Sequence, residues 1–447
     1  MLCSKIDLFL IVFTVFTFTE ASLDDADGHC EKPSVSGTSD CSPVDRYSKE
    51  KKYILYDVNR AEGFNLRRDV YVRIAPFVRA LNAMDEDHEW NLVLPPWERM
   101  YHWRSVDLGA QSQLPWSTFF DIPSLRRYAP VVEMHTFFRE YYAGETTEGS
   151  SIDVVYILRN DPKMFETGKF VDKVEPMECS RERLGYRKNE ENEFTGHFWG
   201  YSNLTARNVG CIVFHGSASG LGKLLEPPNY RSFMFDHMEV PLHDEYGSRE
   251  YWRARRSMRY NSQLYELADK FRLEYLESTN SRDNTPRPLD WAEEKGRRNA
   301  IGGPYLAVHL RRRDFLNGRA NSVPTIKSAA EQLSRKMEDR ELGLLFVATD
   351  ATDDEYEQLK NLMSEYRVHR YVPPRRVKET FKDGGVAIID QIICCHARYF
   401  LGTHESTFTF RIQEDREIMG FPAETTFNRL CGRDKECSPG GQWEIVW

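Results

Sequence analysis

The sequence predicts an α/β protein built from two Rossmann-like domains. Short apolar runs alternate with helical stretches over about 350 residues, which is more chain than one doubly wound domain uses. Several of these runs are continuous, as expected for parallel strands that are covered on both faces. The length of 447 residues, at roughly 100–200 residues per domain, leaves room for both domains and for terminal segments.

The expected elements follow the order of the chain. The expected strands are Tyr53–Asp57, Asn91–Leu94, Val154–Leu158, Cys211–Phe214, Tyr305–Leu310, Leu344–Ala348 and Tyr399–Gly402. The expected helices are Arg67–Asn82, Tyr251–Tyr275, Ser328–Glu338 and Asp353–Tyr366. A long polar helical region begins near residues 240–250, so we divide the chain into an N-terminal domain, 49–240, and a C-terminal domain, 241–430. Ligand sites in such folds lie beyond the carboxyl ends of the strands.

The N-terminus has the pattern of a secretory signal peptide. Lys5 precedes a short apolar run, Leu8–Phe18, and the small residues Thr19 and Ala21 suit cleavage after Ala21. The run is shorter than the roughly 20 residues that a membrane-spanning helix needs. An uncleaved anchor is the alternative, because Asp7 is unusual within a signal peptide.

Cleavage would remove residues 1–21 and leave a polar, turn-rich leader, 22–48, ahead of the folded part. No later stretch is apolar enough to span a bilayer, so the mature chain is expected to have no membrane span. Asn203-Leu204-Thr205 is a glycosylation acceptor, which agrees with passage through the endoplasmic reticulum. We therefore expect a protein of the endoplasmic reticulum lumen.

The cysteines fit such an oxidising compartment. The sequence holds nine Cys, of which Cys3 would leave with the signal peptide. Cys394 and Cys395 lie in an apolar segment and are expected to be buried free thiols, since adjacent Cys rarely pair with each other. The disulfide candidates are Cys30–Cys41, Cys179–Cys211 and, as a small loop in the tail 431–447, Cys431–Cys437.

Composition narrows the classes of partner. Lys and Arg total 60 against 69 Asp and Glu, which gives a formal net charge of −9 at pH 7. A nucleic-acid-binding protein usually has a basic surplus, so no nucleic acid is expected as a partner. An anionic ligand must then be held by local basic residues. No CxxC pair or HExxH motif is present, so no metal site is predicted.

Residues with suitable chemistry follow the first expected strand. After Asp57, a loop carries Glu62, Gly63 and Asn65 ahead of a helix that opens with Arg67. Gly63 lets backbone approach a ligand closely, and Asn65 is expected to cap the helix or to contact that ligand. Glu62 is a carboxylate on a glycine-bearing loop, a position that suits a general base. The alternative is a solvated loop glutamate.

The expected strand Tyr305–Leu310 ends in three arginines, Arg311–Arg313. Two-residue alternation places His309 and Arg311 on the same side of the strand. We expect the three arginines to form one concentrated cationic site, because guanidinium groups make forked hydrogen bonds with phosphate oxygens. A solvated turn with neighbouring salt bridges is the alternative.

Asp390 interrupts an otherwise apolar helix, which is expected to begin after Gly384 and Gly385. Burying an unpaired carboxylate is costly, so Asp390 should have a partner. A helix-side arginine is one candidate. The other is guanine, whose N1–H and exocyclic amine present a matched pair of donors.

The strand Tyr399–Gly402 leads through a turn to a helix expected to begin at Ser406 and Thr407. Hydroxyls and free backbone N–H groups at a helix start form an anion site. Ordinary helix capping is the alternative interpretation.

The absence of three known motifs argues against several enzyme classes. The sequence lacks GxGxxG, GxxxxGK[ST] and GxSxG, which argues against dinucleotide oxidoreductases, P-loop ATPases and serine hydrolases. The features that still need a function are the carboxylate loop in the N-terminal half and the predicted anion site in the C-terminal half. This combination suits a nucleotide-sugar transferase with its site between two domains.

The same segments resemble those of the GDP-fucose protein O-fucosyltransferase family. The similar segments, in order, are YILYDVNRAEGFNLRRDVYVRIA, LVLPPWERMYHWRS, FWGY, GSAS, EYWRARRSM, GGPYLAVHLRRRDF, VATDA, DGGVAIIDQIICCHAR and STFTFRI. The resemblance implies a GT-B-like architecture, in which two Rossmann-like domains face each other across an interdomain cleft. It implies inverting transfer of fucose from GDP-β-L-fucose to Ser or Thr of thrombospondin type 1 repeats, without a required metal or other cofactor.

The resemblance also implies roles for individual residues. Glu62 matches the catalytic base, and Arg311 is expected to stabilise the charge that grows on the β-phosphate. Asp415 stands where the family has an essential Glu and is assigned a catalytic role. The strand ends and the resemblance together predict donor binding by Ala61, Glu62, Gly63, Phe64, Asn65, His309, Leu310, Arg311, Asp390, Ser406, Thr407 and Phe408.

Two other interpretations stay open. The first is an O-fucosyltransferase that acts on another small disulfide-rich repeat, such as an EGF-like repeat. The second is a non-catalytic quality-control module that binds such repeats. A module of that kind has no need of a base, yet Glu62 and Arg311 are both present.

Overall fold

The computed structural model describes residues 49–98, 100–142, 150–168, 171–180, 185–226, 228–432, 437 and 440–447. Lys49–Trp447 forms one unit, to which all the elements below belong. The predicted signal peptide, the leader and the Cys30–Cys41 disulfide lie outside the described residues. Across the described residues, no helix is both long enough and apolar enough to cross a membrane.

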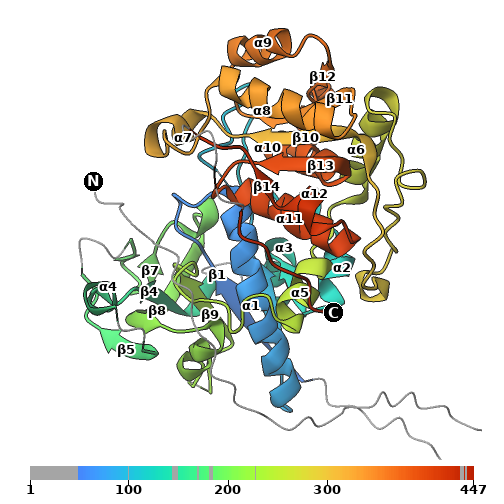
Figure 1. Ribbon diagram of the computed structural model, residues 1–447. Helices are drawn as coiled ribbons and strands as arrows, with labels where there is room; N and C mark the ends of the chain where they lie inside the picture. Colours follow the sequence, from blue (N-terminus) through green and yellow to red (C-terminus); the bar gives the residue numbers. More distant parts are fainter. Residues whose placement is uncertain are drawn as a thin grey trace, which may run out of the picture. The chain divides into compact units, whose positions relative to one another are not determined.

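The first sheet has nine strands in the order β3-β2-β1-β9-β4-β8-β7-β6, and β5 also pairs with β8 (Figure 1). The strands are β1 (Glu50–Tyr56), β2 (His88–Leu94), β3 (Val131–Glu133), β4 (Ser150–Arg159), β5 (Lys173–Met177), β6 (Arg187–Lys188), β7 (Phe194–Thr195), β8 (Leu204–His215) and β9 (Ser232–Asp236). Neighbouring strands along the path β3-β2-β1-β9-β4-β8 pair in parallel. The pairs β5 with β8, β7 with β8 and β6 with β7 are antiparallel. The carboxyl ends of the parallel strands therefore meet at one edge.

The second sheet has five strands in the order β12-β11-β10-β13-β14, and all of its pairs are parallel. The strands are β10 (Gly303–Leu310), β11 (Leu344–Thr349), β12 (Arg367–His369), β13 (Ala397–Gly402) and β14 (Asn428–Arg429). Apart from Pro304, every residue of β10 is buried, as expected for a central parallel strand with both faces covered. Figure 1 shows this sheet in yellow to red, separate from the blue and green first sheet.

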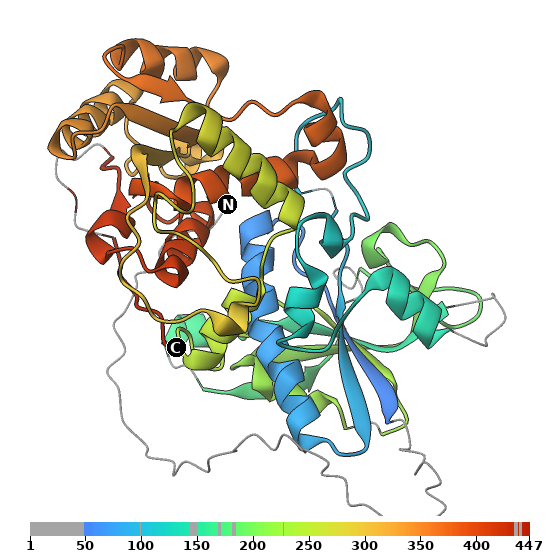
Figure 2. The ribbon, with the colours of Figure 1, turned by 90° about the vertical axis from the view of Figure 1, so that its right-hand side faces the viewer.

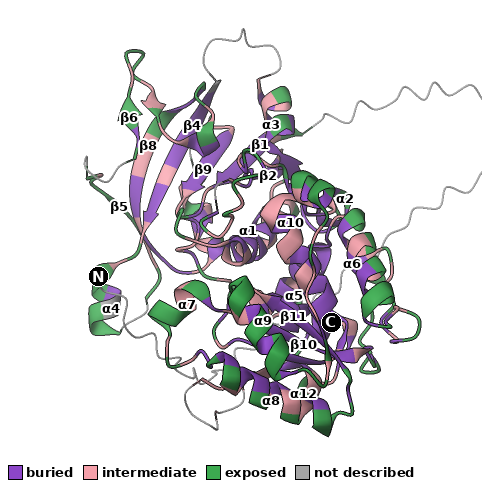
Figure 3. Cartoon of the chain, turned by 90° about the horizontal axis from the view of Figure 1, so that it is seen from above, coloured by how far each residue is buried: buried purple, intermediate pink, exposed green. Residues whose placement is uncertain are grey.

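Helices surround both sheets. They are α1 (Phe64–Met84), α2 (Ile122–Arg126), α3 (Met134–Tyr141), α4 (Pro162–Thr167), α5 (Arg249–Ser257), α6 (Ser262–Tyr275), α7 (Arg313–Gly318), α8 (Ile326–Asp339), α9 (Asp353–Leu362), α10 (Arg375–Cys395), α11 (Thr407–Met419) and α12 (Ala423–Thr426). Figure 3 shows exposed residues on the outer sides of α6, α8 and α9, and buried residues along β1, β2 and β9. Helix α1, blue in Figure 2, contacts β2 and α5 and also α11 of the C-terminal half.

All the predicted strands are found, although β1 ends at Tyr56 and not at Asp57. The predicted helix Tyr251–Tyr275 is wrong. It is two helices, α5 and α6, separated by residues 258–261. Backbone hydrogen bonds pair this segment with residues 119–121, and the Asn261 side chain caps α6. Helix α9 also ends earlier than predicted, at Leu362. Helix α5 packs against α1 and α6 against α10, and the division at residue 240 stays a prediction.

The predicted start of the helix around Asp390 is also wrong. Gly384 and Gly385 lie inside α10, and the helix is interrupted just before them at Lys382, where φ is 55°. A Cβ atom on Gly384 would lie 2.7 Å from the Trp103 ring. Glycine at this position therefore allows the loop that follows β2 to pack directly on α10.

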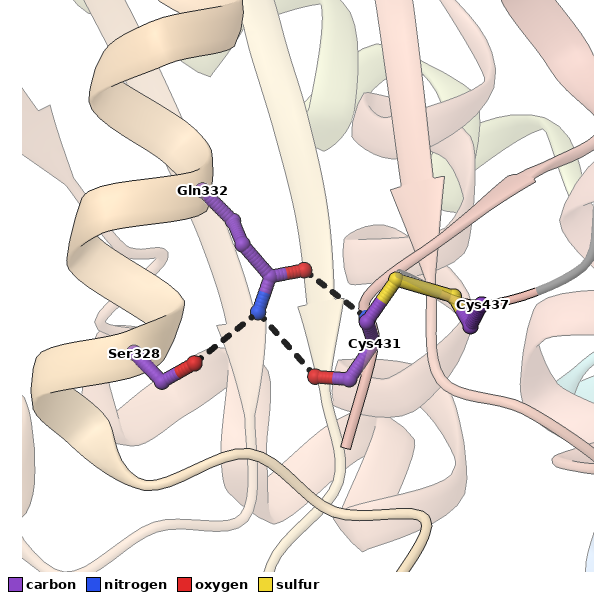
Figure 4. Close-up of a disulfide and its surroundings, with 4 residues drawn as sticks. All are labelled: Ser328, Gln332, Cys431 and Cys437. Atoms are coloured by element: carbon purple, nitrogen blue, oxygen red, sulfur yellow. Dashed lines mark hydrogen bonds between the residues drawn. A yellow bond between two sulfur atoms is a disulfide. The ribbon is translucent and has the colours of Figure 1, made fainter. Parts of the chain in front are cut away.

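Two predicted disulfides are confirmed. Cys179 pairs with Cys211, and Cys431 pairs with Cys437. Figure 4 shows Gln332 of α8 holding the backbone of Cys431 through both ends of its amide. Cys394 and Cys395 are buried free thiols, as predicted.

Candidate active site

A cavity of about 400 Å³ lies where strand ends of the two sheets approach each other. Its walls come from the loops after β1 and β2, from residues that follow β10 and β11, from α10 and from the start of α11. The cavity therefore lies beyond the carboxyl ends of parallel strands, where ligand sites are expected in such folds.

Most of the predicted site residues line this cavity. They are Ala61, Glu62, Gly63, Phe64, Asn65, His309, Arg311, Asp390, Ser406, Thr407 and Phe408. Leu310 and Asp415 are not among the lining residues. The Leu310 side chain is 1% exposed and packs in the core of the second sheet, where it supports the strand.

Glu62 lies just before α1, in the loop after β1. Helix α1 begins at Phe64, and Arg67 of its first turn donates from Nε to the backbone oxygen of Glu62. Burial raises the pKa of the Glu62 carboxyl, and the nearby Glu239 raises it further, against the opposing charge of Arg67. A half-buried carboxylate with a raised pKa is a stronger proton acceptor than a solvated glutamate.

Asn65 does not cap the helix. Gly63 occupies the N-cap position, and Asn65 lies in the first turn of α1. The Asn65 Oδ1 atom accepts hydrogen bonds from Arg68 at 3.1 Å and from Gln391 at 3.0 Å. Asn65 lines the cavity, which agrees with the other predicted possibility, contact with a ligand.

Arg311 is the first residue after β10, and its guanidinium is held by several partners. Nη1 donates to Asp350 at 2.6 Å, and Nη2 donates to Asp314 at 2.5 Å and to Nδ1 of His102 at 3.0 Å. Its backbone N–H donates to the Thr403 hydroxyl at 2.9 Å. Asp350, Asp314 and His102 engage three of the five guanidinium N–H donors, and Arg311 lines the cavity, where its other N–H groups can meet a ligand.

The prediction of one site made of three arginines is wrong. Arg312 is buried and pairs with Glu355 at 2.6 Å, away from the cavity lining. Arg313 donates to the backbone oxygen of Asp350 at 2.7 Å. Helix α7 begins at Arg313, so the strand alternation ends and the three side chains diverge. Arg311 alone of the three lines the cavity.

His309 and the start of α11 form another wall. The His309 ring stacks on Phe408 at 4.3 Å between ring centroids, and its Nδ1 lies 2.8 Å from the Thr409 hydroxyl. Burial lowers the pKa of His309 to about 3, so the ring is neutral at physiological pH. Helix α11 begins at Thr407 with Ser406 as its N-cap, as predicted. Its first backbone N–H groups are therefore available to an anion.

Asp390 lies on the α10 wall of the cavity. Its side chain is partly buried, and its buried Oδ1 atom has no hydrogen-bond partner within the described part of the chain. Burial raises the pKa of this carboxyl to about 8. The helix-side arginine that was one candidate partner is therefore absent among the described residues, which leaves the donors of a ligand.

We expect GDP affinity to rise with pH up to about 8 and then to level off. If guanine binds at Asp390, its donors favour the ionised carboxylate, so binding must expel the Asp390 proton below its pKa of about 8. Asp390→Asn cannot ionise and should bind GDP more weakly, without this pH dependence. Calorimetric titration of both proteins with GDP at several pH values measures the effect, and comparison with the variant cancels the titration of the phosphates. Identical pH profiles would contradict the assignment.

The loop after β2 contributes residues that sequence reasoning missed. Tyr101, His102 and Trp103 line the cavity. Because Arg311 has donors only, Nδ1 of His102 must accept its hydrogen bond, which places the His102 proton on Nε2. Burial and the charge of Arg311 lower the pKa of His102 to about 4. The aromatic segment MYHWRS was the available signal, although its spacing gives no specific chemistry.

A polar contact holds this loop against the other half of the site. Asp383 at the break in α10 accepts from the Ser105 hydroxyl at 2.6 Å and from Gln111 at 3.0 Å. Lys382 donates to the backbone oxygen of Leu108 at 2.7 Å. The break in α10 therefore serves as an anchor for the loop that carries His102.

Asp415 belongs to a buried ion network outside the cavity lining. Its Oδ1 lies 3.0 Å from Arg255 Nη2, and Arg287 is 4.0 Å away. Burial favours the neutral acid, but Arg255 and Arg287 outweigh it and lower the pKa of Asp415. The Tyr260 hydroxyl lies 3.4 Å from Asp415 Oδ2 and 3.3 Å from Gln391 Oε1, and its one proton is shared between these two acceptors. The catalytic role assigned to Asp415 stays a prediction, and its contacts are those of a counterion.

We expect Asp415→Ala to be strongly impaired and Asp415→Glu to remain active. Removing one partner of a buried ion pair typically costs about 3–5 kcal/mol, because the other charge is left unpaired. The alanine variant should therefore lose thermal stability together with turnover, while the longer carboxylate keeps a partner for Arg255. Thermal unfolding and turnover measured on both variants test this. Full activity and an unchanged Tm in Asp415→Ala would exclude an essential role.

Comparison with known sequences places the chain among sugar-transferring proteins. Residues 53–419 match the family model described as GDP-fucose protein O-fucosyltransferase. The chain is 44% identical over 403 residues to GDP-fucose protein O-fucosyltransferase 2 of Homo sapiens, covering 90% of this chain and 91% of that protein. It is 44% identical over 410 residues to the protein of the same name in Caenorhabditis elegans, covering 90% and 92%.

Solved structures show the same fold. POFUT1 in complex with GDP superposes with a TM-score of 0.55 at 15% identity, covering 86% of this chain and 99% of that chain. POFUT1 in complex with GDP-fucose superposes with a TM-score of 0.54 at 15% identity, covering 87% and 99%. The predicted GT-B-like α/β architecture is therefore confirmed.

Proposed function

The chain belongs to the GDP-fucose protein O-fucosyltransferase family, and we propose that it moves fucose with inversion to Ser or Thr hydroxyls of folded thrombospondin type 1 repeats. It is a GDP-fucose-dependent transferase. The observation that carries the proposal is a single cavity that receives Glu62 from the loop after β1 and Arg311 from the end of β10. A carboxylate and a guanidinium from different halves are what an inverting transfer needs on opposite faces of one sugar carbon.

The C-terminal half supplies the groups that suit the nucleotide. Oδ1 of Asp390 is a buried acceptor without a hydrogen-bond partner among the described residues, and guanine brings two N–H donors. The start of α11, at Thr407 and Phe408, presents backbone N–H groups and a helix dipole to an anion. Arg311 retains donors for phosphate oxygens. We assign donor binding mainly to residues 241–430, with a contribution from the loop Ala61–Asn65 in the other half, and the acceptor side to residues 49–240.

The Glu62 carboxylate is the proposed general base. It takes the proton of the acceptor hydroxyl as the hydroxyl oxygen attacks the anomeric carbon of fucose. The C–O bond to the β-phosphate breaks at the same time, and GDP leaves from the opposite face. The raised pKa of Glu62 favours this proton transfer, because a base is more effective when its pKa approaches the working pH.

Arg311 is proposed to stabilise the leaving group. Negative charge grows on the β-phosphate as the bond breaks, and a fixed cation lowers the energy of that state more than the energy of the bound substrate. Asp350 and Asp314 hold the guanidinium, so it is oriented before the reaction begins. This use of a side-chain cation supports a reaction that needs no metal ion or other cofactor.

Activity is expected to survive chelation of divalent metal ions. The proposed charge stabilisation comes from Arg311, which EDTA does not remove. Turnover of GDP-fucose with an acceptor repeat, measured with and without EDTA, tests this. Loss of turnover with EDTA and recovery with manganese or magnesium would contradict the role given to Arg311.

The acceptor is best identified by product analysis. Purified protein and GDP-fucose are incubated with an isolated, folded thrombospondin type 1 repeat and, in a parallel reaction, with an EGF-like repeat. The masses of the products are then measured by mass spectrometry. We expect one added fucose on the thrombospondin repeat only. Fucose on the EGF-like repeat instead would favour the second acceptor class. Binding of a repeat without transfer would favour the quality-control module.

The proposed location is the lumen of the endoplasmic reticulum. The Cys179–Cys211 and Cys431–Cys437 disulfides suit an oxidising compartment, and thrombospondin repeats are themselves held by disulfides. Localisation of the full-length tagged chain, with a glycosidase digest at Asn203, tests this proposal.

A further inference from the structure

A buried glutamine beside Asp390 joins the two walls of the cavity. Gln391 lies on α10 and is 1% exposed, and it is absent from the cavity lining. Its amide makes hydrogen bonds to groups on α1, on α11 and in the segment between α5 and α6. Gln391 therefore connects elements that surround the cavity while having no access to it.

The amide uses both of its ends. Oε1 accepts from Arg68 Nη1 at 2.8 Å and from the Tyr260 hydroxyl at 3.3 Å. Nε2 donates to Asn65 Oδ1 at 3.0 Å and to the backbone oxygen of Phe408 at 3.4 Å. Asn65 and Phe408 both line the cavity, on opposite halves of the site.

Arg68 decides which way both amides face. Its guanidinium is fully buried and has donors only, so each amide must turn an oxygen toward it. Arg68 Nη1 donates to Gln391 Oε1 and also to Asn65 Oδ1 at 3.1 Å. Once Oε1 of Gln391 faces Arg68, Nε2 is left to face Asn65. A flipped Asn65 would place its amide hydrogens against donors on both Arg68 and Gln391.

These hydrogen bonds determine which atoms of Asn65 are available to a ligand. Both lone pairs of Oδ1 are occupied by Arg68 and Gln391, so the Nδ2 hydrogens are the groups left for the cavity. We propose that Gln391 is a positioning residue, which together with Arg68 locks Asn65 as a hydrogen-bond donor to an oxygen atom of the nucleotide-sugar. The inference rests on the proposed function for the identity of that ligand.

The substitution Gln391→Glu separates positioning from folding. A carboxylate still accepts from Arg68 and Tyr260, and it gives the buried Arg68 charge an anionic partner. It has no hydrogen to donate to Asn65, whose Oδ1 it would repel. We expect Tm to stay unchanged or to rise, while GDP-fucose affinity and kcat/KM for the donor fall about 10- to 100-fold. A merely structural glutamine would lose stability and activity together.

Gln332→Glu is the matched control. Gln332 also uses both ends of its amide, toward Ser328 and Cys431, and it lies on α8 away from the cavity lining (Figure 4). Its substitution should lower Tm slightly and leave the donor kinetics unchanged. If Gln391→Glu does not fold, Gln391→Met, which has a similar length and no donor, takes its place in the binding measurement.

A double-mutant cycle with Asn65→Ala identifies the route of the effect. If Gln391 acts through Asn65, the double variant should lose no more donor affinity than Asn65→Ala alone. Additive losses, or full donor affinity in Gln391→Glu, would overturn the inference. Calorimetry with GDP-fucose gives this result even without an acceptor. Failure of the proposed function would appear separately, as wild-type protein that binds no GDP-fucose or transfers no fucose.

Discussion

Replacing Glu62 with Gln is expected to lower turnover by about 10²–10⁴-fold, the usual effect of losing a general base. Glutamine has nearly the same shape and keeps the backbone contact between Glu62 and Arg67, so GDP-fucose affinity should change little. Because the base acts only when ionised, kcat/KM of the wild type should fall as pH drops through the pKa of Glu62, which lies above its ordinary value. That acid limb should be missing in the variant.

Glu86→Gln is the control for this experiment. Glu86 is exposed in the turn between α1 and β2, so its substitution should leave both turnover and the pH profile unchanged. Steady-state kinetics and calorimetric titration with GDP-fucose on the three proteins provide the comparison. Near-normal turnover in folded Glu62→Gln would remove Glu62 from the reaction.

The second large effect is expected at Arg311, where charge and geometry can be separated. Arg311→Lys keeps a positive charge but replaces a planar fork with a compact ammonium. If Arg311 stabilises the departing phosphate, the loss should appear mainly in kcat, on the order of 10²-fold or more, since that charge develops only as the bond breaks. A lysine also cannot satisfy Asp350, Asp314 and His102 in the same way, so the cation loses its fixed orientation.

Arg313→Lys is the matched control for this substitution. Arg313 follows the same strand but is not among the residues that line the cavity, and its Nε donates to the backbone oxygen of Asp350. It should show near wild-type kcat and KM. Saturation kinetics with GDP-fucose distinguish the two cases. Equal effects at Arg311 and Arg313, confined to KM, would reduce Arg311 to a charge that attracts the donor.

The fold class could be predicted because its signals are local. A parallel strand covered on both faces is a continuous apolar run, and β1, β10, β11 and β13 each carry one. The shorter strands were missed, since β3, β12 and β14 are held by pairing with their neighbours rather than by their own pattern. The break between α5 and α6 was missed for the same reason, because residues 119–121 impose it from another part of the chain.

The order of residues along the chain also specifies which side chains end the strands, and parallel pairing then brings those ends to one edge. Glu62 and Arg311 could be chosen from their places after predicted strands, and both line the cavity. What each side chain meets there depends on tertiary contacts. Arg312 turns to Glu355, Asp415 joins Arg255 outside the cavity lining, and Asp390 has no hydrogen-bond partner for its Oδ1 among the described residues. A strand end gives a residue its position, but the direction and charge of its side chain depend on groups supplied by distant segments.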